Sequence, residues 1–501
     1  MKLNFNEYRD KVYACWIGKN IGGTMGTPFE GTREMLDIDG FSTKPGVILP
    51  NDDLDLQLVW FLAVERLGMR SVDAKVLGEF WTSYIGPHWN EYGLSKVNMT
   101  AGLLPPLSGD AYNSWNNSNG AWIRTEIWAT LAPACPDVAV KYAYEDACVD
   151  HGTKEGTYAA MFVAALESAA FVETDLRKLI YLALKKIPKE SRMAKSIDKV
   201  LECYDSGMDY REARNVIQKL NADIGNGWFE APSNVSYAMI GLLWGEGDFK
   251  KSMIYAINCG DDTDCTGATV GSVLGIMYGT RGIPEDWRRH IGDDIVTISI
   301  KKGMIHAPRF PETCTELTDR VVRVAPTVPI LFRKPVEFTD GPNEVSCADI
   351  EAMFAPSPEI FPGLVEPGQE NLTDEILTVP AYSYKINSQF LSATVYFDGE
   401  PDVKPSGSIN VHLRIKNNVY DYGNMPHNLS VRWLGAEGWD IDGAQFVRLP
   451  HVTRHTKKGD VELVYTLTAP EKIEARNRLV IEIYTEGRPT VAYVPVTILG
   501  K

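Results

Sequence analysis

The spacing of apolar residues divides this 501-residue chain into two parts. As far as about residue 320, apolar side chains recur at helical intervals of three or four positions, as in the run 59–67 that follows Asp53. Similar runs, bounded by Gly, Pro and Asp, cover 158–169, 174–187, 192–204 and 234–258. Alternating apolar and polar runs of the kind that build βαβ units are scarce here. The pattern therefore predicts an all-α domain over residues 1–325.

Beyond residue 320 the pattern changes. Residues 340–375 are rich in Pro, Gly, Asn and Glu, which predicts a linker or an irregular crossover over residues 326–375. Further on, apolar and polar positions alternate in the stretches 391–397, 409–415, 461–467, 479–484 and 491–496. Short strands separated by Gly, Asn and Pro turns predict a β-sandwich over residues 376–501. We therefore expect a multidomain protein, with a helical domain followed by a C-terminal β-sandwich.

Composition and charge exclude several classes of partner. Lys and Arg number 50 against 66 Asp and Glu, a formal net charge of −16, whereas non-specific binding to nucleic acid or to an anionic membrane needs a cationic face. The segment MKLNFNEYRDKVYACWIGKN lacks the apolar core of a secretory signal, and no later segment approaches about 18 uninterrupted apolar residues. The eight cysteines form no CxxC pair and no zinc spacing. A reduced, cytoplasmic location is the expectation.

Two acidic clusters precede helical runs. The first is Asn51-Asp52-Asp53-Leu54-Asp55, and the second is Asp261-Asp262-Thr263-Asp264-Cys265-Thr266. One or two Asp or Asn residues at a helix start are ordinary N-caps. Here, however, each cluster crowds several carboxylates together without a Lys or Arg, and such charges repel one another unless a cation neutralises them. Oxygen ligands without His favour Mg²⁺, Mn²⁺ or Ca²⁺ over zinc.

Three glycines follow the second cluster at positions 267, 271 and 275. Their spacing places them on one face of the helix that begins there. Each interior Gly costs a helix about 1 kcal/mol, so a packing reason is expected. The stripe therefore predicts that a second helix approaches closely beside the cluster.

Five segments occur in an order that resembles a known family. They are the Gly-rich opening 16–30, which ends at Glu30, then Asn51-Asp52-Asp53, Asn119-Gly120-Ala121-Trp122-Ile123-Arg124, Asp150-His151-Gly152 and Asp262-Thr263-Asp264. Together, within about residues 10–280, they resemble the ADP-ribosylglycohydrolases, the superfamily of dinitrogenase-reductase-activating glycohydrolase and crystallin J1. The resemblance implies an orthogonal all-α bundle with a site for two Mg²⁺ or Mn²⁺ ions. It also implies a hydrolase that cleaves the N- or O-glycosidic bond between ADP-ribose and a protein side chain.

The resemblance also implies roles for single residues. The implied metal ligands are Asn51, Asp52, Asp53, Asp262, Asp264 and Cys265. Glu30 and Asp53 are the candidate catalytic residues, with Glu30 as a gated ligand or an acid/base, because a carboxylate can accept a proton from water that a metal ion orients. The candidate substrate-binding residues are Asn119, Gly120, Arg124, His151 and Glu230, the last because it follows Trp228 and Phe229 after a Gly turn.

Three positions depart from the family pattern. Asn51 stands where Thr is usual, Cys265 where a ligand Thr or Ser is usual, and Gly23-Thr24 where Gly-Asp is common. A thiol is a poor ligand for Mg²⁺, so the identity of one metal ion stays open.

Two alternatives to ADP-ribosyl hydrolysis also stay open. One is a glycosidase that acts on a small furanoside or nucleoside with the same metal site, and the other is a non-catalytic binding or structural member of the fold. The expected partner is a small-molecule or ADP-ribosyl-protein substrate, without nucleic acid or membrane. Association with further copies of the chain is left open.

Overall fold

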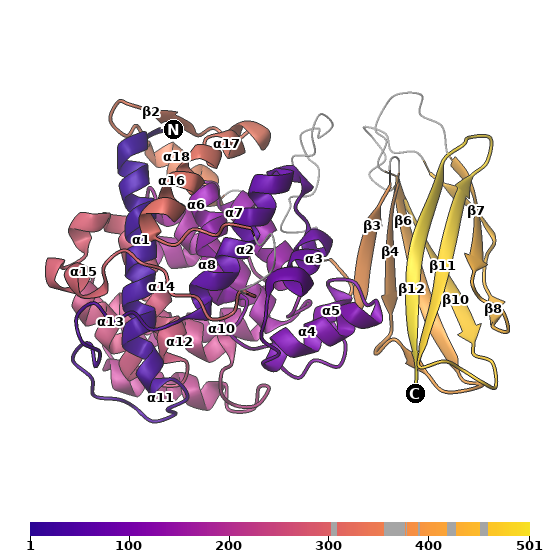
Figure 1. Ribbon diagram of the computed structural model, residues 1–501, viewed down its shortest axis with the longest axis horizontal. Coiled ribbons are helices and arrows are strands. Elements are labelled where there is room, and N and C mark those ends of the chain that lie inside the picture. Colours follow the sequence, from indigo (N-terminus) through magenta and orange to yellow (C-terminus); the bar gives the residue numbers. More distant parts are fainter. Residues whose placement is uncertain (302–307, 355–375, 377, 389–390, 418–426, 451–458) are drawn as a thin grey trace.

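The computed structural model describes residues 1–301, 308–354, 376, 378–388, 391–417, 427–450 and 459–501. A helical body is followed by a region of strands that stands beside it (Figure 1). Within the described ranges, none of the helices has the length and the apolar character needed to cross a membrane. All eight cysteines are free thiols.

The helical body contains the predicted helices. Its helices are α1 (Phe5–Gly26), α2 (Asp52–Leu67), α3 (Ala74–Tyr84), α4 (Asn90–Ala101), α5 (Leu107–Asp110), α6 (Glu126–Leu131), α7 (Pro136–Ala147), α8 (Glu155–Ala170), α9 (Leu176–Leu184), α10 (Arg192–Asp205), α11 (Tyr210–Leu220), α12 (Ala231–Gly245), α13 (Phe249–Asn258), α14 (Thr263–Tyr278), α15 (Glu285–Ile291) and α16 (Cys314–Val324). The predicted run 234–258 is two helices, α12 and α13. Glu246 and Gly247 separate them because both adopt positive φ, at 53° and 85°.

Helices α1 and α14 pack against each other at glycines. A Cβ atom on Gly18 would lie 2.1 Å from the carbonyl oxygen of Gly271, and one on Gly26 would lie 2.3 Å from that of Thr263. Only residues without a Cβ permit backbones to approach so closely. The close helix packing predicted from the glycine stripe of α14 is therefore confirmed. It places the C-terminal end of α1 beside the N-terminal end of α14.

Part of the predicted linker packs against the helical body. Residues 326–354 include α17 (Thr327–Leu331), β2 (Glu337–Thr339) and α18 (Cys347–Phe354), and β2 pairs in parallel with β1 (Lys2–Asn4). The amino-terminal ammonium group donates a hydrogen bond of 2.8 Å to the carbonyl oxygen of Pro335. Residues 355–375 of the same predicted linker lie outside the described residues. The domain boundaries stay a prediction.

The C-terminal region forms two five-stranded sheets, with strand orders β3-β4-β6-β10-β8 and β5-β12-β11-β7-β9. The strands are β3 (Ser383–Asn387), β4 (Leu391–Phe397), β5 (Asp402–Val403), β6 (Ser408–Asn417), β7 (His427–Leu434), β8 (Asp440–Asp442), β9 (Phe446–Leu449), β10 (Asp460–Thr468), β11 (Arg476–Thr485) and β12 (Val491–Gly500). The five predicted alternating stretches lie in β4, β6, β10, β11 and β12. Buried side chains of both sheets, such as Leu413 and Ile481, belong to one hydrophobic cluster.

The α4–α5 segment joins the helical body to the strands (Figure 1). Leu103, Leu107 and Ala111 of this segment belong to the same hydrophobic cluster as the buried side chains of the sheets. The backbone N–H of Tyr382 donates to the Asp110 carboxylate at 3.2 Å. The strand-rich region therefore shares its apolar core with the helical body at this segment.

Candidate active site

The first acidic cluster forms the N-terminal turn of α2. Asn51 is the N-cap, and its Oδ1 accepts a hydrogen bond of 2.7 Å from the backbone N–H of Asp53. The Asp52 carboxylate accepts a hydrogen bond of 2.8 Å from the hydroxyl of Tyr92 on α4. Asp53 is buried. The capping role therefore belongs to Asn51, and the two carboxylates that follow it are not needed to cap the helix.

The second acidic cluster forms a sharp turn before α14. Asp261, at a φ of 68°, accepts hydrogen bonds from the backbone N–H of Phe229 and from the Asn234 side chain, both at 3.1 Å. Its backbone is tied to the segment after Glu30, since the N–H of Gly31 donates to the Asp261 carbonyl and the N–H of Asp261 donates to the Thr32 carbonyl. Asp261 is thus used by the fold itself.

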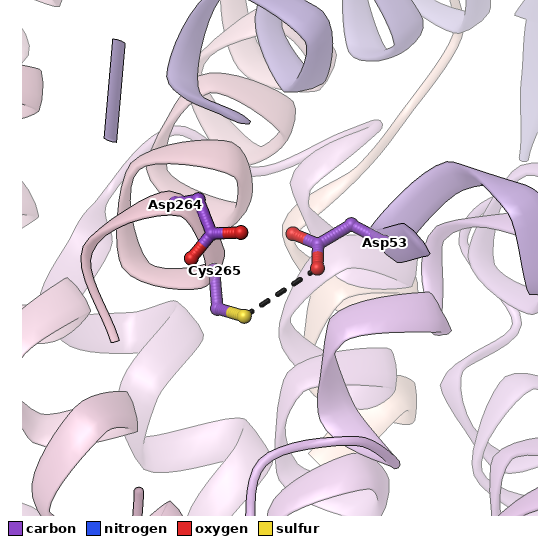
Figure 2. Close-up of side chains that lie close together, drawn as sticks. All are labelled: Asp53, Asp264 and Cys265. Atoms are coloured by element: carbon purple, nitrogen blue, oxygen red, sulfur yellow. Dashed lines mark hydrogen bonds between the residues drawn. The ribbon is translucent and has the colours of Figure 1, made fainter. Parts of the chain in front are cut away.

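The fold brings the two clusters together. The ligand atoms of Asp53, Asp264 and Cys265 all lie within 4.8 Å of one another, and so do those of Glu30, Asp262 and Asp264. The Cys265 thiol donates a hydrogen bond of 3.4 Å to Asp53, 212 positions away in the sequence (Figure 2). Two helix starts that are distant in the sequence therefore face each other, as the resemblance implied.

Three buried carboxylate oxygens in this group have no hydrogen-bond partner among the described residues. They are Oδ2 of Asp53, Oδ1 of Asp262 and Oδ1 of Asp264. A buried, ionised carboxylate oxygen without a partner is strongly destabilising, so such atoms normally have a counter-charge or bind a metal ion. The donor set, which is mostly carboxylate oxygen with one amide and one thiol, fits a divalent cation.

Burial and mutual repulsion raise the pKa values of Glu30, Asp52 and Asp262. Burial, together with the charge of Asp264, raises the pKa of Asp52 and, more strongly, that of Asp262. Glu30 stays partly open to solvent, yet desolvation by the surrounding protein and the charges of Asp264 and Asp52 raise its pKa to about 8. Without a cation, the site therefore favours neutral carboxyl groups over carboxylates.

Lys19 on α1 supplies the positive charge that neither acidic cluster contains. Its Nζ lies 3.8 Å from Oδ2 of Asp53 and 2.7 Å from Oε1 of Glu126, and the Gln57 side chain donates to the other Glu126 oxygen at 2.9 Å. Lys19 is 2 % exposed. Lys19, Gln57 and Glu126 were not predicted from the sequence as residues of the site. The signal that could have found Lys19 is a charged side chain within the Gly-rich opening.

Arg124 and His151 lie in a fully buried network behind the acidic group. Arg124 forms ion pairs with Asp146 at 2.9 Å and with Asp150 at 2.7 Å. The His151 Nδ1 lies 2.9 Å from Asp150, and its Nε2 lies 3.1 Å from the Ser118 hydroxyl. Although burial raises the pKa of Asp150, the charges of Arg124 and His151 outweigh that effect and lower it to about 2. Both side chains are thus engaged in protein contacts, and their binding of substrate stays a prediction.

Asn119, Gly120 and Glu230 occupy different surroundings. The Asn119 side chain donates a hydrogen bond of 2.6 Å to Asp262, which places it at the acidic group. Gly120 lies against Glu91, since a Cβ there would be 2.3 Å from a Glu91 oxygen. Glu230 instead accepts a hydrogen bond of 2.6 Å from the backbone N–H of Asn226, and burial raises its pKa to about 7.

The helical body identifies the family to which the chain belongs. Residues 5–325, more than half of the chain, match the family model described as ADP-ribosylglycohydrolase. The chain belongs to the ADP-ribosylglycohydrolase family. The resemblance carried by the five sequence segments is thereby confirmed.

Several relatives of this chain bear functional names. The ADP-ribosylhydrolase ARH3 of Mus musculus is 24% identical over 233 residues, which are 40% of this chain and 61% of the relative. The ADP-ribosylarginine hydrolase Tri1 of Pseudomonas putida (strain GB-1) is 34% identical over 50 residues, 10% of this chain and 14% of the relative. This chain therefore matches less than two thirds of the length of either relative.

A solved structure named "ADP-ribosylglycohydrolase-related protein complex" has a TM-score of 0.40 and 19% sequence identity to this chain, and the match covers 66% of this chain and 99% of that chain.

One departure of this chain from the family pattern, Asn51, lies against Gly23 of α1. A Cβ atom on Gly23 would lie 2.4 Å from Nδ2 of Asn51, so a larger residue there would displace the amide. The same amide nitrogen lies 3.4 Å from Oδ2 of Asp264. The small residue on α1 therefore makes room for the longer polar side chain that bridges the two helix starts.

Proposed function

We propose that this ADP-ribosylglycohydrolase is a binuclear-metal-dependent hydrolase that cleaves the N- or O-glycosidic bond of ADP-ribosylated substrates. The observation that carries the proposal is the meeting of the two acidic clusters, with three buried carboxylate oxygens that lack a partner among the described residues. The names of the relatives, which describe hydrolases of ADP-ribosyl and ADP-ribosylarginine groups, support this substrate class.

In this proposal the residues of the site hold the metal ions, transfer a proton or orient a ligand. Two Mg²⁺ ions, with Mn²⁺ or Ca²⁺ as alternatives, would be held by Asn51, Asp52, Asp53, Asp262, Asp264 and Cys265. Such ions, when bound, lower the pKa of water and orient it. Glu30 would exchange a proton with the reacting water, because a carboxyl pKa of about 8 suits proton transfer near neutral pH. Asn119 would keep the Asp262 carboxylate oriented through its hydrogen bond.

We also infer that the C-terminal sheets form a β-sandwich. The support for this is the single hydrophobic cluster to which both sheets contribute, since inward side chains of two facing sheets interdigitate in this way. The region lies outside the family match, and its contact with the α4–α5 segment is a means of bracing the helical body.

A product assay on the full-length protein tests the proposed activity. We expect release of ADP-ribose from ADP-ribosylated arginine and serine peptides with Mg²⁺ or Mn²⁺ present, and a loss of about 100-fold in Asp262→Asn. The matched control is Asp198→Asn, an exposed Asp on α10, which should keep the wild-type rate.

The other outcomes of this assay would refute the proposed site or support one of the two alternative functions. An unchanged rate in Asp262→Asn refutes the proposed site. Turnover of free furanosides or nucleosides, without turnover of ADP-ribosylated peptides, would support the alternative of a glycosidase for small furanosides or nucleosides. A folded protein that binds no divalent cation at millimolar concentration belongs to the non-catalytic alternative.

A further inference from the structure

We propose that Cys265, Asp53 and Asp264 form one cation position of this site. The sulfur of Cys265 makes this position prefer a borderline divalent cation such as Zn²⁺, Co²⁺ or Fe²⁺. This inference rests on the proposed function, and it deepens it by naming the class of cation at the same site. It concerns a residue that departs from the family pattern, in which Thr or Ser is usual at this position.

The geometry of the three side chains supports a common ligand. The Cys265 sulfur and one oxygen from each of Asp53 and Asp264 lie within 4.8 Å of one another. Figure 2 shows the two carboxylates facing each other, with the sulfur of Cys265 beside both. The exposed fractions of the three residues are 6% for Cys265, 1% for Asp53 and 5% for Asp264. Protein atoms therefore enclose the group almost completely.

The carboxylates of this group are available to a ligand. Oδ2 of Asp53 and Oδ1 of Asp264 are buried and have no hydrogen-bond partner in the described part of the chain. Helix capping does not use them, because Asn51 caps α2 and the N-cap of α14, Asp262, makes no side-chain capping hydrogen bond. Two carboxylates, each with a buried oxygen that makes no hydrogen bond among the described residues, thus lie beside the Cys265 sulfur.

A divalent cation would offset much of the negative charge of this group. A thiolate and two carboxylates carry three negative charges, and the ammonium of Lys19 lies 3.8 Å from Asp53 but closer to Glu126, at 2.7 Å. A bound divalent cation would supply two further positive charges. On binding, the S–H bond of Cys265 breaks, its proton passes to solvent and a sulfur–metal bond forms, so at least one proton leaves for each cation bound at this position.

Ligand softness decides which cation is preferred. Mg²⁺ is a hard ion that binds oxygen, whereas a thiolate favours Zn²⁺ and its first-row neighbours. The hydroxyl of a Thr at position 265 would be a hard donor. Replacing that oxygen by sulfur therefore shifts the preference of this position away from Mg²⁺ without removing either carboxylate.

Cobalt spectroscopy tests the inference on the metal-free full-length protein. Titration with Co²⁺ should produce a near-ultraviolet thiolate-to-cobalt charge-transfer band. Cys265→Thr should lose the band, and calorimetry should show a fall of at least about tenfold in the ratio of its affinities for Zn²⁺ and Mg²⁺. The matched control is Cys259→Ser, since this buried thiol donates to the carbonyl of Tyr255 and should leave the band unchanged.

Two results would overturn the inference. Co²⁺ binding without a charge-transfer band in the wild type, or a band that persists in Cys265→Thr, would show that the sulfur is no ligand, while the proposed hydrolase could still use Mg²⁺. Failure of the wild type to bind either Co²⁺ or Mg²⁺ would instead remove the cation site, and with it both this inference and the proposed function.

Discussion

At the scale of single residues, Lys19 sets the charge balance of the buried site. It lies between Asp53 and Glu126 and also donates a hydrogen bond of 2.7 Å to the carbonyl of Ile123. Although burial acts to lower its pKa, the charges of Glu126 and Asp53 outweigh this and raise it, so the side chain stays an ammonium ion. Removing that charge would leave two buried carboxylates unpaired.

Lys19→Met should therefore destabilise the metal-free protein by about 3–5 kcal/mol, as expected when one partner of a buried ion pair is lost. Lys11→Met is a matched control on the same helix. Lys11 is also buried, but it donates to the carbonyl of Phe171 and pairs with an exposed Glu7, so its loss should cost only about 1–2 kcal/mol. Urea unfolding measures both, and equal losses would contradict the role given to Lys19.

The residue scale also shows what the sequence could reveal. Asp53 and Asp264 were predicted because carboxylates crowded at a helix start are a local signal. Lys19 was not, since its partner Glu126 is 107 positions away and only the fold joins them. Asp261 and Asp262 look alike in the sequence, yet the positive φ of Asp261 turns its side chain to Phe229 and Asn234, whereas Asp262 meets Asn119.

At the scale of elements, the crossing of α1 and α14 positions the site. The glycine contacts fix the end of α1, and with it the Glu30 segment, against the start of α14, which carries Asp264. The sequence predicted this contact from the spacing of glycines. It could not predict that the α4–α5 segment shares a core with the sheets, because Leu107 and its partners are far apart in the chain.

Gly271→Ala should disrupt this crossing. Its Cβ would lie 2.1 Å from the backbone oxygen of Gly18, and backbone cannot move aside as a flexible side chain can. We expect a loss of about 3 kcal/mol in the free energy of unfolding, with weaker cation binding as the helix starts separate. Gly40→Ala, where no atom of the described residues lies within 4 Å, should be near neutral. Urea unfolding and calorimetry measure both effects, and unchanged stability in Gly271→Ala would refute the close contact.

At the scale of the whole molecule, the acidic residues serve two purposes. The chain carries a net charge of −16, and within the site burial raises the pKa values of Asp52 and Asp262. A raised pKa means that the folded protein binds more protons than the unfolded chain. Ionisation of these groups therefore opposes folding unless a cation is bound.

The stability of the metal-free protein should fall as the pH rises. For Glu30, the stabilising effect is fully present below its ordinary pKa of 4.5 and is lost as the pH rises through about 8. Glu230, with a pKa of about 7, acts in the same direction. Melting temperatures between pH 5 and pH 9 in a chelator measure the effect. Added Mg²⁺ should make the melting temperature less dependent on pH, and Glu30→Gln should reduce its fall with rising pH. A melting temperature that rises between pH 5 and pH 9 would contradict this prediction.

Two backbone hydrogen bonds join Asp261 to the segment after Glu30, so the two segments are mechanically coupled. Moving Glu30 outward would break both bonds, at about 1 kcal/mol each, and would pull on the residue next to Asp262. Displacement of Glu30 and strain in the turn that carries Asp262 are therefore coupled through the backbone.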